Sequence, residues 1–179
     1  NYPIVIGHEW AGEIRVGNTD YPAGSRVVVE GVIACGTCDE CRRGATNRCA
    51  SYDEYGFTRD GAAMDTVFAT PDLVHLLAPS VSWEAAALTE PAAVVLRALQ
   101  RIDPDDNERV LIVGDGTIAL LAALLVRQWN PSSVTMLGAR EEQRSLAETA
   151  RVDYFTVDPG ATDASYTLIV DAAGAVAAT

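Results

Sequence analysis

Four cysteines lie close together in this chain, at a spacing that suits a metal ion. The chain has no others, and they follow the pattern C-x2-C-x2-C-x7-C at Cys35, Cys38, Cys41 and Cys49. Four thiolates on a turning segment can surround one Zn²⁺ tetrahedrally, and such a closed structural site leaves no position for a substrate. Two disulfides or four unrelated buried thiols are alternatives, but neither explains why all cysteines fall in one segment. We therefore predict a structural zinc, whose surplus negative charge Arg42, Arg43 and Arg48 would offset.

A glycine-rich turn at residues 114–119 has the pattern G-x-G-x-x-A. It lies between an apolar run at 110–113 and an apolar helical segment. In a dinucleotide site Gly114 would form the tight bend, and Gly116 would let the backbone approach a pyrophosphate. The amides of the helix start, at Thr117 and Ile118, would bind its charge. An ordinary strand-to-helix turn is the alternative, but the strand before it and the helix after it favour a nucleotide site.

The end of the next strand decides which nicotinamide cofactor such a turn would bind. NAD enzymes carry an acid there for the ribose 2′-hydroxyl, whereas this chain has Gly138, followed by Ala139 and Arg140. Without a carboxylate a 2′-phosphate is not repelled, and Arg140 could bind it through two parallel hydrogen bonds. The alternative is a solvated arginine near a helix start, but the helix dipole disfavours a cation there. The sequence thus favours NADP(H) over NAD(H).

His8 and two acids are a weaker signal for a second metal. Glu9 adjoins His8, glycines flank the pair at positions 7 and 12, and Glu90 lies in an apolar segment. Two carboxylates and an imidazole could hold an open catalytic metal, although a lone histidine is most often structural. His75, in a short expected strand without acidic or cysteine neighbours, is predicted to be structural.

Composition excludes several classes of function. The chain has 179 residues, 49% of them apolar, which suffices for one or two domains with a core. Its net charge is −12, without a basic stripe, so nucleic acids and anionic membranes are not expected partners. The longest apolar run, residues 118–126, is far shorter than the ~20 residues of a membrane span. No signal peptide is visible, and reduced, zinc-bound cysteines favour a cytoplasmic location.

The elements that must position these residues fall into two parts. The first 78 residues are expected to be mostly β, with strands at 13–16, 26–33, 66–69 and 73–76. Ser82 should cap a helix over 83–88, and a second helix should run from Pro91 to about residue 101. The polar turn at 104–107 is the expected domain boundary. Strands at 109–113, 134–137, 154–157 and 168–171 then alternate with helices at 116–129 and 141–151, which predicts a doubly wound parallel sheet.

Taken together, these motifs resemble the zinc-dependent medium-chain alcohol and polyol dehydrogenases. The matching elements run in the family's order along essentially the whole chain: Gly7-His8-Glu9-x-x-Gly12, the cysteine segment, Glu90-Pro91-Ala92-Ala93-Val94, the glycine-rich turn and Asp171-Ala172-Ala173-Gly174. Glu90-Pro91 stands where other alcohol dehydrogenases have a cysteine, so the sorbitol, polyol and threonine branch is the more similar one. Gly138-Ala139-Arg140 resembles the Gly-Ser-Arg of NADP-dependent members, and residues 7–10 and 56–61 are similar to aminocyclitol dehydrogenases.

The resemblance implies an α/β protein with a GroES-like, mostly β catalytic domain at 1–81, which contains the zinc lobe 35–49. Linking helices at 82–103 and a Rossmann domain at 104–179 would follow. His8 would ligate a catalytic zinc, Glu9 would ligate it or lie beside it, and Glu90 would be the third ligand or hold the zinc-bound water. The family's upstream catalytic cysteine, its proton-relay hydroxyl, its last Rossmann strands and its interface segment have no counterpart here. The chain, from Asn1-Tyr2-Pro3 to residues 177–179, is therefore expected to be a central fragment and inactive alone.

The leading hypothesis is an enzyme that transfers a hydride between NADP(H) and a small secondary alcohol, polyol or cyclitol, as a homo-oligomer when full length. A bound zinc would polarise the substrate oxygen. One rival is a non-catalytic module that binds zinc and nucleotide, and another is a zinc-free quinone reductase of the same superfamily. The zinc content of the full-length protein distinguishes them: two ions per subunit for the enzyme, one for the module and none for the reductase.

Overall fold

The computed structural model describes residues 3–162 and 165–174. The expected features at Asn1-Tyr2 and at residues 177–179 lie outside these ranges. The chain divides into two units, Asn1–Glu90 and Pro91–Thr179, each with its own sheet and core. In the described residues no helix has the length and apolar character needed to cross a membrane.

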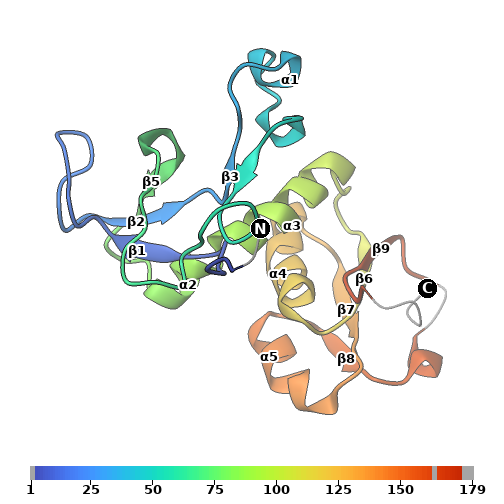
Figure 1. The fold of residues 1–179 in the computed structure, drawn as a ribbon. Coiled ribbons are helices and arrows are strands. Elements are labelled where there is room, and N and C mark those ends of the chain that lie inside the picture. Colours follow the sequence, from blue (N-terminus) through green and yellow to red (C-terminus); the bar gives the residue numbers. More distant parts are fainter. Residues whose placement is uncertain (1–2, 163–164, 175–179) are drawn as a thin grey trace. The chain divides into compact units, whose positions relative to one another are not determined.

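The first unit is built on a three-stranded antiparallel sheet in the order β1-β2-β5 (Figure 1). Its strands are β1 (Ala11–Glu13), β2 (Arg26–Val29) and β5 (Val74–Leu76). Val27, Val29 and Val74 form its buried core, and Trp10, Ile14, Tyr21 and Leu73 pack around them. The β-branched valines suit such a half-buried pleated surface, which explains why β2 forms here.

A separate two-stranded ribbon carries the cysteine segment. It pairs β3 (Val32–Ile33) with β4 (Asp53–Glu54), in antiparallel register. Between the two strands lie a single helical turn, α1 (Asp39–Arg42), and the 3₁₀ turn η1 (Thr46–Arg48). All four cysteines therefore lie in the segment between β3 and β4.

The predicted bounds of several strands in this unit are wrong. The single strand expected at 26–33 is broken after Val29, where the Glu30 N–H donates to Leu73 and Gly31 accepts from Tyr55 instead. The strand expected at 13–16 is observed at Ala11–Glu13, because the Ile14 backbone bonds to the turn at residues 24–25. Residues 66–69 form no strand, and the carbonyl of Phe68 accepts from the Tyr55 hydroxyl. The helical turns α1, η1 and η2 (Pro71–Leu73) were not expected.

Two helices follow, close to where the sequence predicts them. In α2 (Trp83–Ala87), the Ser82 hydroxyl accepts a hydrogen bond from the Ala85 N–H at 3.1 Å, as expected for an N-cap. The longer α3 (Thr89–Ile102) begins in the first unit and continues into the second, where Val95 and Leu99 are buried in the core.

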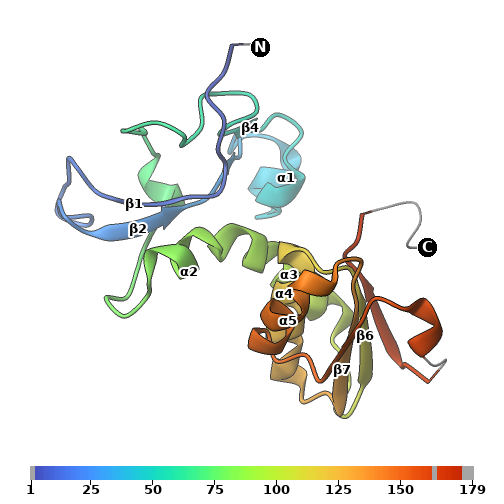
Figure 2. The same ribbon diagram turned by 90° about the horizontal axis from the view of Figure 1, so that it is seen from below.

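The second unit is a parallel four-stranded sheet in the order β8-β7-β6-β9. Its strands are β6 (Arg109–Val113), β7 (Ser133–Leu137), β8 (Tyr154–Thr156) and β9 (Leu168–Asp171). The helices α4 (Thr117–Val126) and α5 (Arg144–Thr149) lie side by side on one face of the sheet (Figure 2). The predicted fold class, a GroES-like part followed by a doubly wound sheet, is confirmed.

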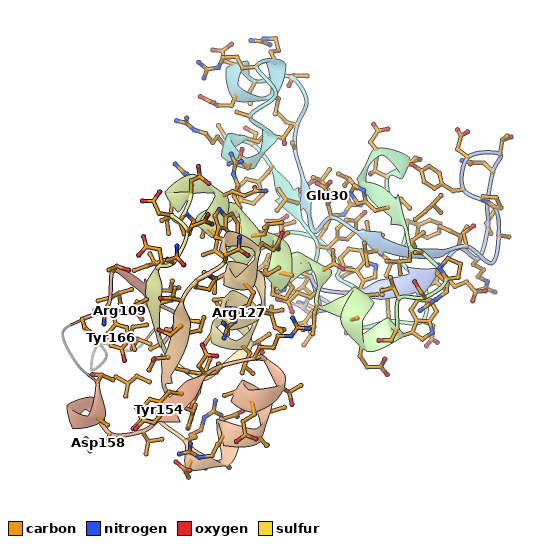
Figure 3. The ribbon with its side chains drawn as sticks, turned by 180° about the vertical axis from the view of Figure 1, so that it is seen from behind. Glu30, Arg109, Arg127, Tyr154, Asp158 and Tyr166 are labelled. Atoms are coloured by element: carbon orange, nitrogen blue, oxygen red, sulfur yellow. The ribbon has the colours of Figure 1, made fainter. Side chains whose placement is uncertain are left out.

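The helices of this unit are shorter than their apolar patterns suggest. The helix expected at 116–129 is α4 followed by the 3₁₀ turn η3 (Arg127–Trp129), which ends where Asn130 adopts a left-handed conformation. The helix expected at 141–151 starts as the 3₁₀ turn η4 (Glu141–Gln143) before α5. A last 3₁₀ turn, η5 (Pro159–Ala161), precedes β9. Arg127, labelled in Figure 3, donates to Asp153, whose carboxylate also accepts the Val134 N–H at 2.7 Å.

Candidate zinc and nucleotide sites

The four cysteine sulfurs converge on one point. All are free thiols, and the four Sγ atoms lie within 4.8 Å of one another. The Sγ of Cys38 is 3.4 Å from that of Cys41 and 4.0 Å from that of Cys49, and the Cys35 and Cys41 sulfurs are 3.9 Å apart. A tetrahedron with Zn–S bonds of about 2.3 Å has S···S edges of about 3.8 Å, whereas a disulfide needs about 2.05 Å. This geometry fits zinc and excludes disulfides.

Backbone donors also prepare the cluster for a cation. Hydrogen bonds from the Thr37 backbone and hydroxyl, followed by the Cys38 N–H and the Cys49 side chain, lower the pKa of Cys35 to about 6. Desolvation and the neighbouring cysteines raise the pKa of Cys41 to about 12. Hydrogen bonds from the Cys41 and Ala50 backbones also lower the pKa of Cys38. The thiolates of Cys35 and Cys38 are thus favoured while that of Cys41 is opposed, and a bound cation would remove that opposition because metal ligation deprotonates thiols.

The three arginines expected to offset the charge of the cluster make their ion pairs with acids of α1. Arg42 pairs with Asp39, and Arg43 pairs with Glu40, each one turn away along the chain. Arg48 lies 3.8 Å from Glu40. The acids of α1 therefore engage these guanidinium groups, and the backbone N–H groups of Cys35 and Cys38 donate to the sulfurs instead.

A second group of donors gathers His8, Glu9 and Glu90. One ligand atom from each lies within 4.8 Å of the other two, and His8 Nε2 is 3.6 Å from Glu9 Oε1. The His8 side chain is 38% exposed, and the Phe57 ring lies against it at a centroid distance of 4.9 Å. Burial, followed by the nearby Glu9 carboxylate, raises the pKa of Glu90. Three donors of these types, partly open to solvent, fit an open zinc site.

The backbone around His8 is held by a segment more than fifty residues away. The N–H groups of Gly61, Ala62 and Ala63 donate to the carbonyls of residues 5, 7 and 6, at 2.7 to 2.9 Å. The Asp60 carboxylate accepts the Val5 N–H at 2.9 Å. A Cβ on Gly61 would lie 2.2 Å from the Gly7 carbonyl oxygen, so only glycine allows this approach.

His75 has an acidic partner that its sequence neighbours do not reveal. Its Nε2 lies 2.9 Å from Glu30 Oε1, on the strand β5 next to the end of β2 (Glu30 is labelled in Figure 3). Both side chains are 56% exposed. Antiparallel pairing brings together these residues, which are far apart in sequence, and the structural role of His75 stays a prediction.

The glycine-rich turn lies where the strand order of the second unit reverses, between β6 and β9. Gly114 has φ of +116°, and its N–H donates to Leu137 at 2.8 Å. A Cβ on Gly114 would lie 2.9 Å from the backbone of Ala172. Gly116 has no atom within 4 Å of its Cβ position, and α4, which begins at Thr117 and Ile118, has no side-chain cap. Its first amides are therefore not used by a capping side chain and are available to an anion, as a site at a topological switch point requires.

Asp115, inside the turn, receives four hydrogen bonds from the segment after β7. Its Oδ2 accepts the N–H groups of Ala139 and Arg140 at 2.9 and 2.8 Å. Its Oδ1 accepts Nε and Nη2 of Arg140 at 3.2 and 2.7 Å. Burial acts to raise the pKa of Asp115, but these hydrogen bonds outweigh it and lower the pKa. The pairing explains how a cation is tolerated at the start of the 141–149 helical segment.

Gly138 lies beside this carboxylate. A Cβ at Gly138 would lie 2.7 Å from the Phe155 ring and 3.0 Å from Asp115 Oδ2. Sequence reasoning treated Gly138 only as a missing acid, and it missed Asp115, Phe57 and Asp60. For Asp115 a signal existed, since its carboxylate is a second anion in a turn expected to bind a pyrophosphate and therefore needs partners of its own.

Comparisons with known proteins agree with this arrangement. Residues 1–79 match the family described as the alcohol dehydrogenase GroES-like domain. The chain is 34% identical over 154 residues to D-altritol 5-dehydrogenase from Agrobacterium fabrum, a match that covers 82% of this chain and 46% of that relative.

Solved structures show the same fold. Galactitol-1-phosphate dehydrogenase from Escherichia coli superposes with a TM-score of 0.77 at 32% identity, over 87% of this chain and 46% of that one. An alcohol dehydrogenase from E. coli CFT073 in complex with NADH gives a TM-score of 0.83 at 26% identity, over 96% of this chain and 55% of that one. The chain spans about half the length of the curated relatives it matches.

Proposed function

Because the chain belongs to the zinc-dependent medium-chain dehydrogenase family, we propose that its protein transfers a hydride between NADP(H) and a secondary alcohol of a small polyol or cyclitol. The observation that carries this proposal is the group of His8, Glu9 and Glu90, gathered in a chain that also has an open dinucleotide turn. Relatives that act, by name, on D-altritol and on galactitol 1-phosphate support a polyol as the substrate.

In this proposal each cluster has one role. The sulfurs of the cysteine cluster hold a structural zinc that orders the segment between β3 and β4. His8 Nε2 and the Glu90 carboxylate, with Glu9 as a further ligand or a neighbour, hold the catalytic zinc. When bound in an open site, that ion supplies Lewis-acid polarisation of an alcohol oxygen. The Phe57 ring limits the rotation of the His8 imidazole, and the hydrogen bonds from residues 61–63 fix its backbone.

The cofactor preference rests on the second unit. Gly116 and the first amides of α4 would bind the diphosphate. No carboxylate extends from position 138, and the half-exposed Arg140 guanidinium is available to a 2′-phosphate. One relative was solved with NADH, so the preference for NADP(H) is argued from this chain's own residues. Reduced, metal-binding thiols favour a cytoplasmic location, and we expect a homo-oligomer.

Activity and metal content of the full-length protein test the proposal together. Pentitols, hexitols, hexitol phosphates and cyclitols are offered with NADP⁺ or NAD⁺, and formation of the reduced nicotinamide is followed by its absorbance. We expect turnover of at least one polyol, preferably with NADP⁺, and two zinc ions per subunit by elemental analysis. His8→Ala should remove one zinc ion and most of the turnover. His75→Ala, the matched control, should keep two zinc ions per subunit and the turnover of the parent protein. No turnover with any polyol at full zinc content would overturn the proposal.

A further inference from the structure

Asp115 is the one acid in the nucleotide turn, and its acceptor positions are all in use. A carboxylate offers about four lone-pair positions, and Ala139 and Arg140 supply four donors to Asp115. Its side chain is only 8% exposed. With no acceptor position left, Asp115 cannot receive a ribose hydroxyl while Arg140 stays in place. It therefore does not replace the acid that NAD enzymes carry at the end of the second strand.

The Arg140 guanidinium keeps one edge free. It has five N–H groups, and the edge formed by Nε and Nη2 faces Asp115 Oδ1. In the ranges that the structure describes, Asp115 is the side chain to which this guanidinium donates, and the arginine is 49% exposed. The Nη1 edge thus remains for a second anion, and its fork geometry matches two phosphate oxygens.

Asp115 has two opposite effects on such a phosphate. Its negative charge repels the phosphate, but the arginine and two backbone N–H groups already compensate that charge. Its hydrogen bonds also restrict a long side chain, which would otherwise lose rotamer freedom when it is fixed. Because ordering in advance lowers the cost of binding, and because charge effects are screened at a half-exposed group, the ordering effect should be the larger one.

We propose that Asp115 is the positioning residue for the 2′-phosphate of NADP(H): it anchors the backbone of residues 139–140 and holds Arg140 with one guanidinium edge free for the phosphate. This inference rests on the proposed NADP(H) function. It assigns a specificity role to the variable residue of the G-x-G turn, in addition to the glycines.

Calorimetry with two nucleotides tests the role of Asp115 in the full chain. Adenosine 2′,5′-bisphosphate and adenosine 5′-phosphate differ only in the 2′-phosphate, so the ratio of their affinities isolates that group. We expect Asp115→Asn, which keeps the size but releases the guanidinium, to lower this ratio about tenfold. Arg140→Ala should lower it about ten- to a hundred-fold. The double variant should resemble Arg140→Ala alone.

Asp153→Asn is the matched control. The Asp153 carboxylate lies in the same unit and, like that of Asp115, accepts hydrogen bonds from an arginine side chain and from the backbone; its partners are Arg127 and the N–H of Val134 in β7. It should leave the ratio as in the parent chain. Arg140→Lys provides a second variant if Asp115→Asn does not fold, since lysine keeps the charge but lacks the fork. Its ratio should fall close to that of Arg140→Ala.

The outcomes separate this inference from the proposed function. An unchanged or higher ratio in Asp115→Asn, with a lower one in Arg140→Ala, overturns the positioning role and leaves the phosphate site standing. A parent-like ratio in Arg140→Lys has the same consequence. If Arg140→Ala itself leaves the ratio unchanged, the 2′-phosphate site of the proposed function fails, and the role of Asp115 fails with it.

Discussion

Single residues decide the chemistry of this chain through neighbours that are distant in sequence. The buried Asp115 and the half-exposed Arg140 form an ion pair that links the glycine-rich turn to the segment after β7. Gly138 is packed against both Asp115 and Phe155. A substitution at any of these positions therefore acts on packing and charge together, and each effect needs its own control.

Gly138→Asp should destabilise the second unit without converting the cofactor preference to NAD(H). A Cβ at this position meets the Phe155 ring at 2.7 Å, and the new carboxylate would lie beside Asp115. Overpacking of this kind costs about 1–3 kcal/mol. Urea unfolding should show a lower free energy of unfolding for both Gly138→Ala and Gly138→Asp. Gly138→Ala introduces only the steric clash, so Gly138→Asp should lose more stability. A stable Gly138→Asp protein with tighter NAD⁺ binding would contradict this view of the site.

Asp115 should also make stability depend on pH. Its pKa is lowered in the folded state, so its contribution is fully present above the unfolded value of about 3.9 and is lost as the pH falls through the folded value. Asp115→Asn should reduce the free energy of unfolding by about 1–3 kcal/mol at pH 7. The difference from the parent should shrink below about pH 4. A difference that stays constant from pH 7 to pH 3 would show that the ionised form contributes nothing.

The helices and strands of this chain differ in how closely they follow from the sequence. The Ser82 cap of α2 is local and follows from a short sequence signal. The strands of the first unit depend on pairing between separate segments: β1 begins two residues before its expected start, and the strand expected at 26–33 is divided into β2 and β3. Local elements are accordingly the safer place for a quantitative prediction.

Ser82→Ala should destabilise the first unit by about 1 kcal/mol, because the Ala85 N–H loses the acceptor that caps it. Ser80→Ala, two residues earlier and without a capping role, is the control and should change stability by less than about 0.5 kcal/mol. Chemical denaturation followed by circular dichroism measures both. Equal effects of the two substitutions would show that the hydroxyl of Ser82 does not stabilise α2.

At the scale of the whole molecule, the two units have separate cores and different stabilising devices. The first has a small valine core, with the cysteine cluster on a ribbon outside it. The second has a larger core that joins the sheet to α3, α4 and α5. Loss of metal should therefore affect one unit first.

A zinc chelator should increase hydrogen exchange at residues 35–54 and leave the strands β6 and β7 protected. The ligands of the cysteine cluster all lie in the first unit, and the segment has few buried apolar side chains to order it without metal. Cys41→Ser should give the same pattern without chelator and reduce the zinc content, whereas Asp39→Asn on the same helical turn should retain the metal. Unchanged zinc in Cys41→Ser would contradict the assignment.

The sequence by itself determined the features that depend on neighbouring residues or on a fixed period. The cysteine spacing, the turn between β6 and α4 and the alternation of the parallel sheet all follow from such patterns, and the fold class was predicted from them. Only the tertiary structure decided which charged groups meet. It paired His75 with Glu30, and Arg140 with Asp115. The physical reason is that pattern and propensity act along the chain, whereas charges pair through space, across strands and turns that the register of the sheets brings together.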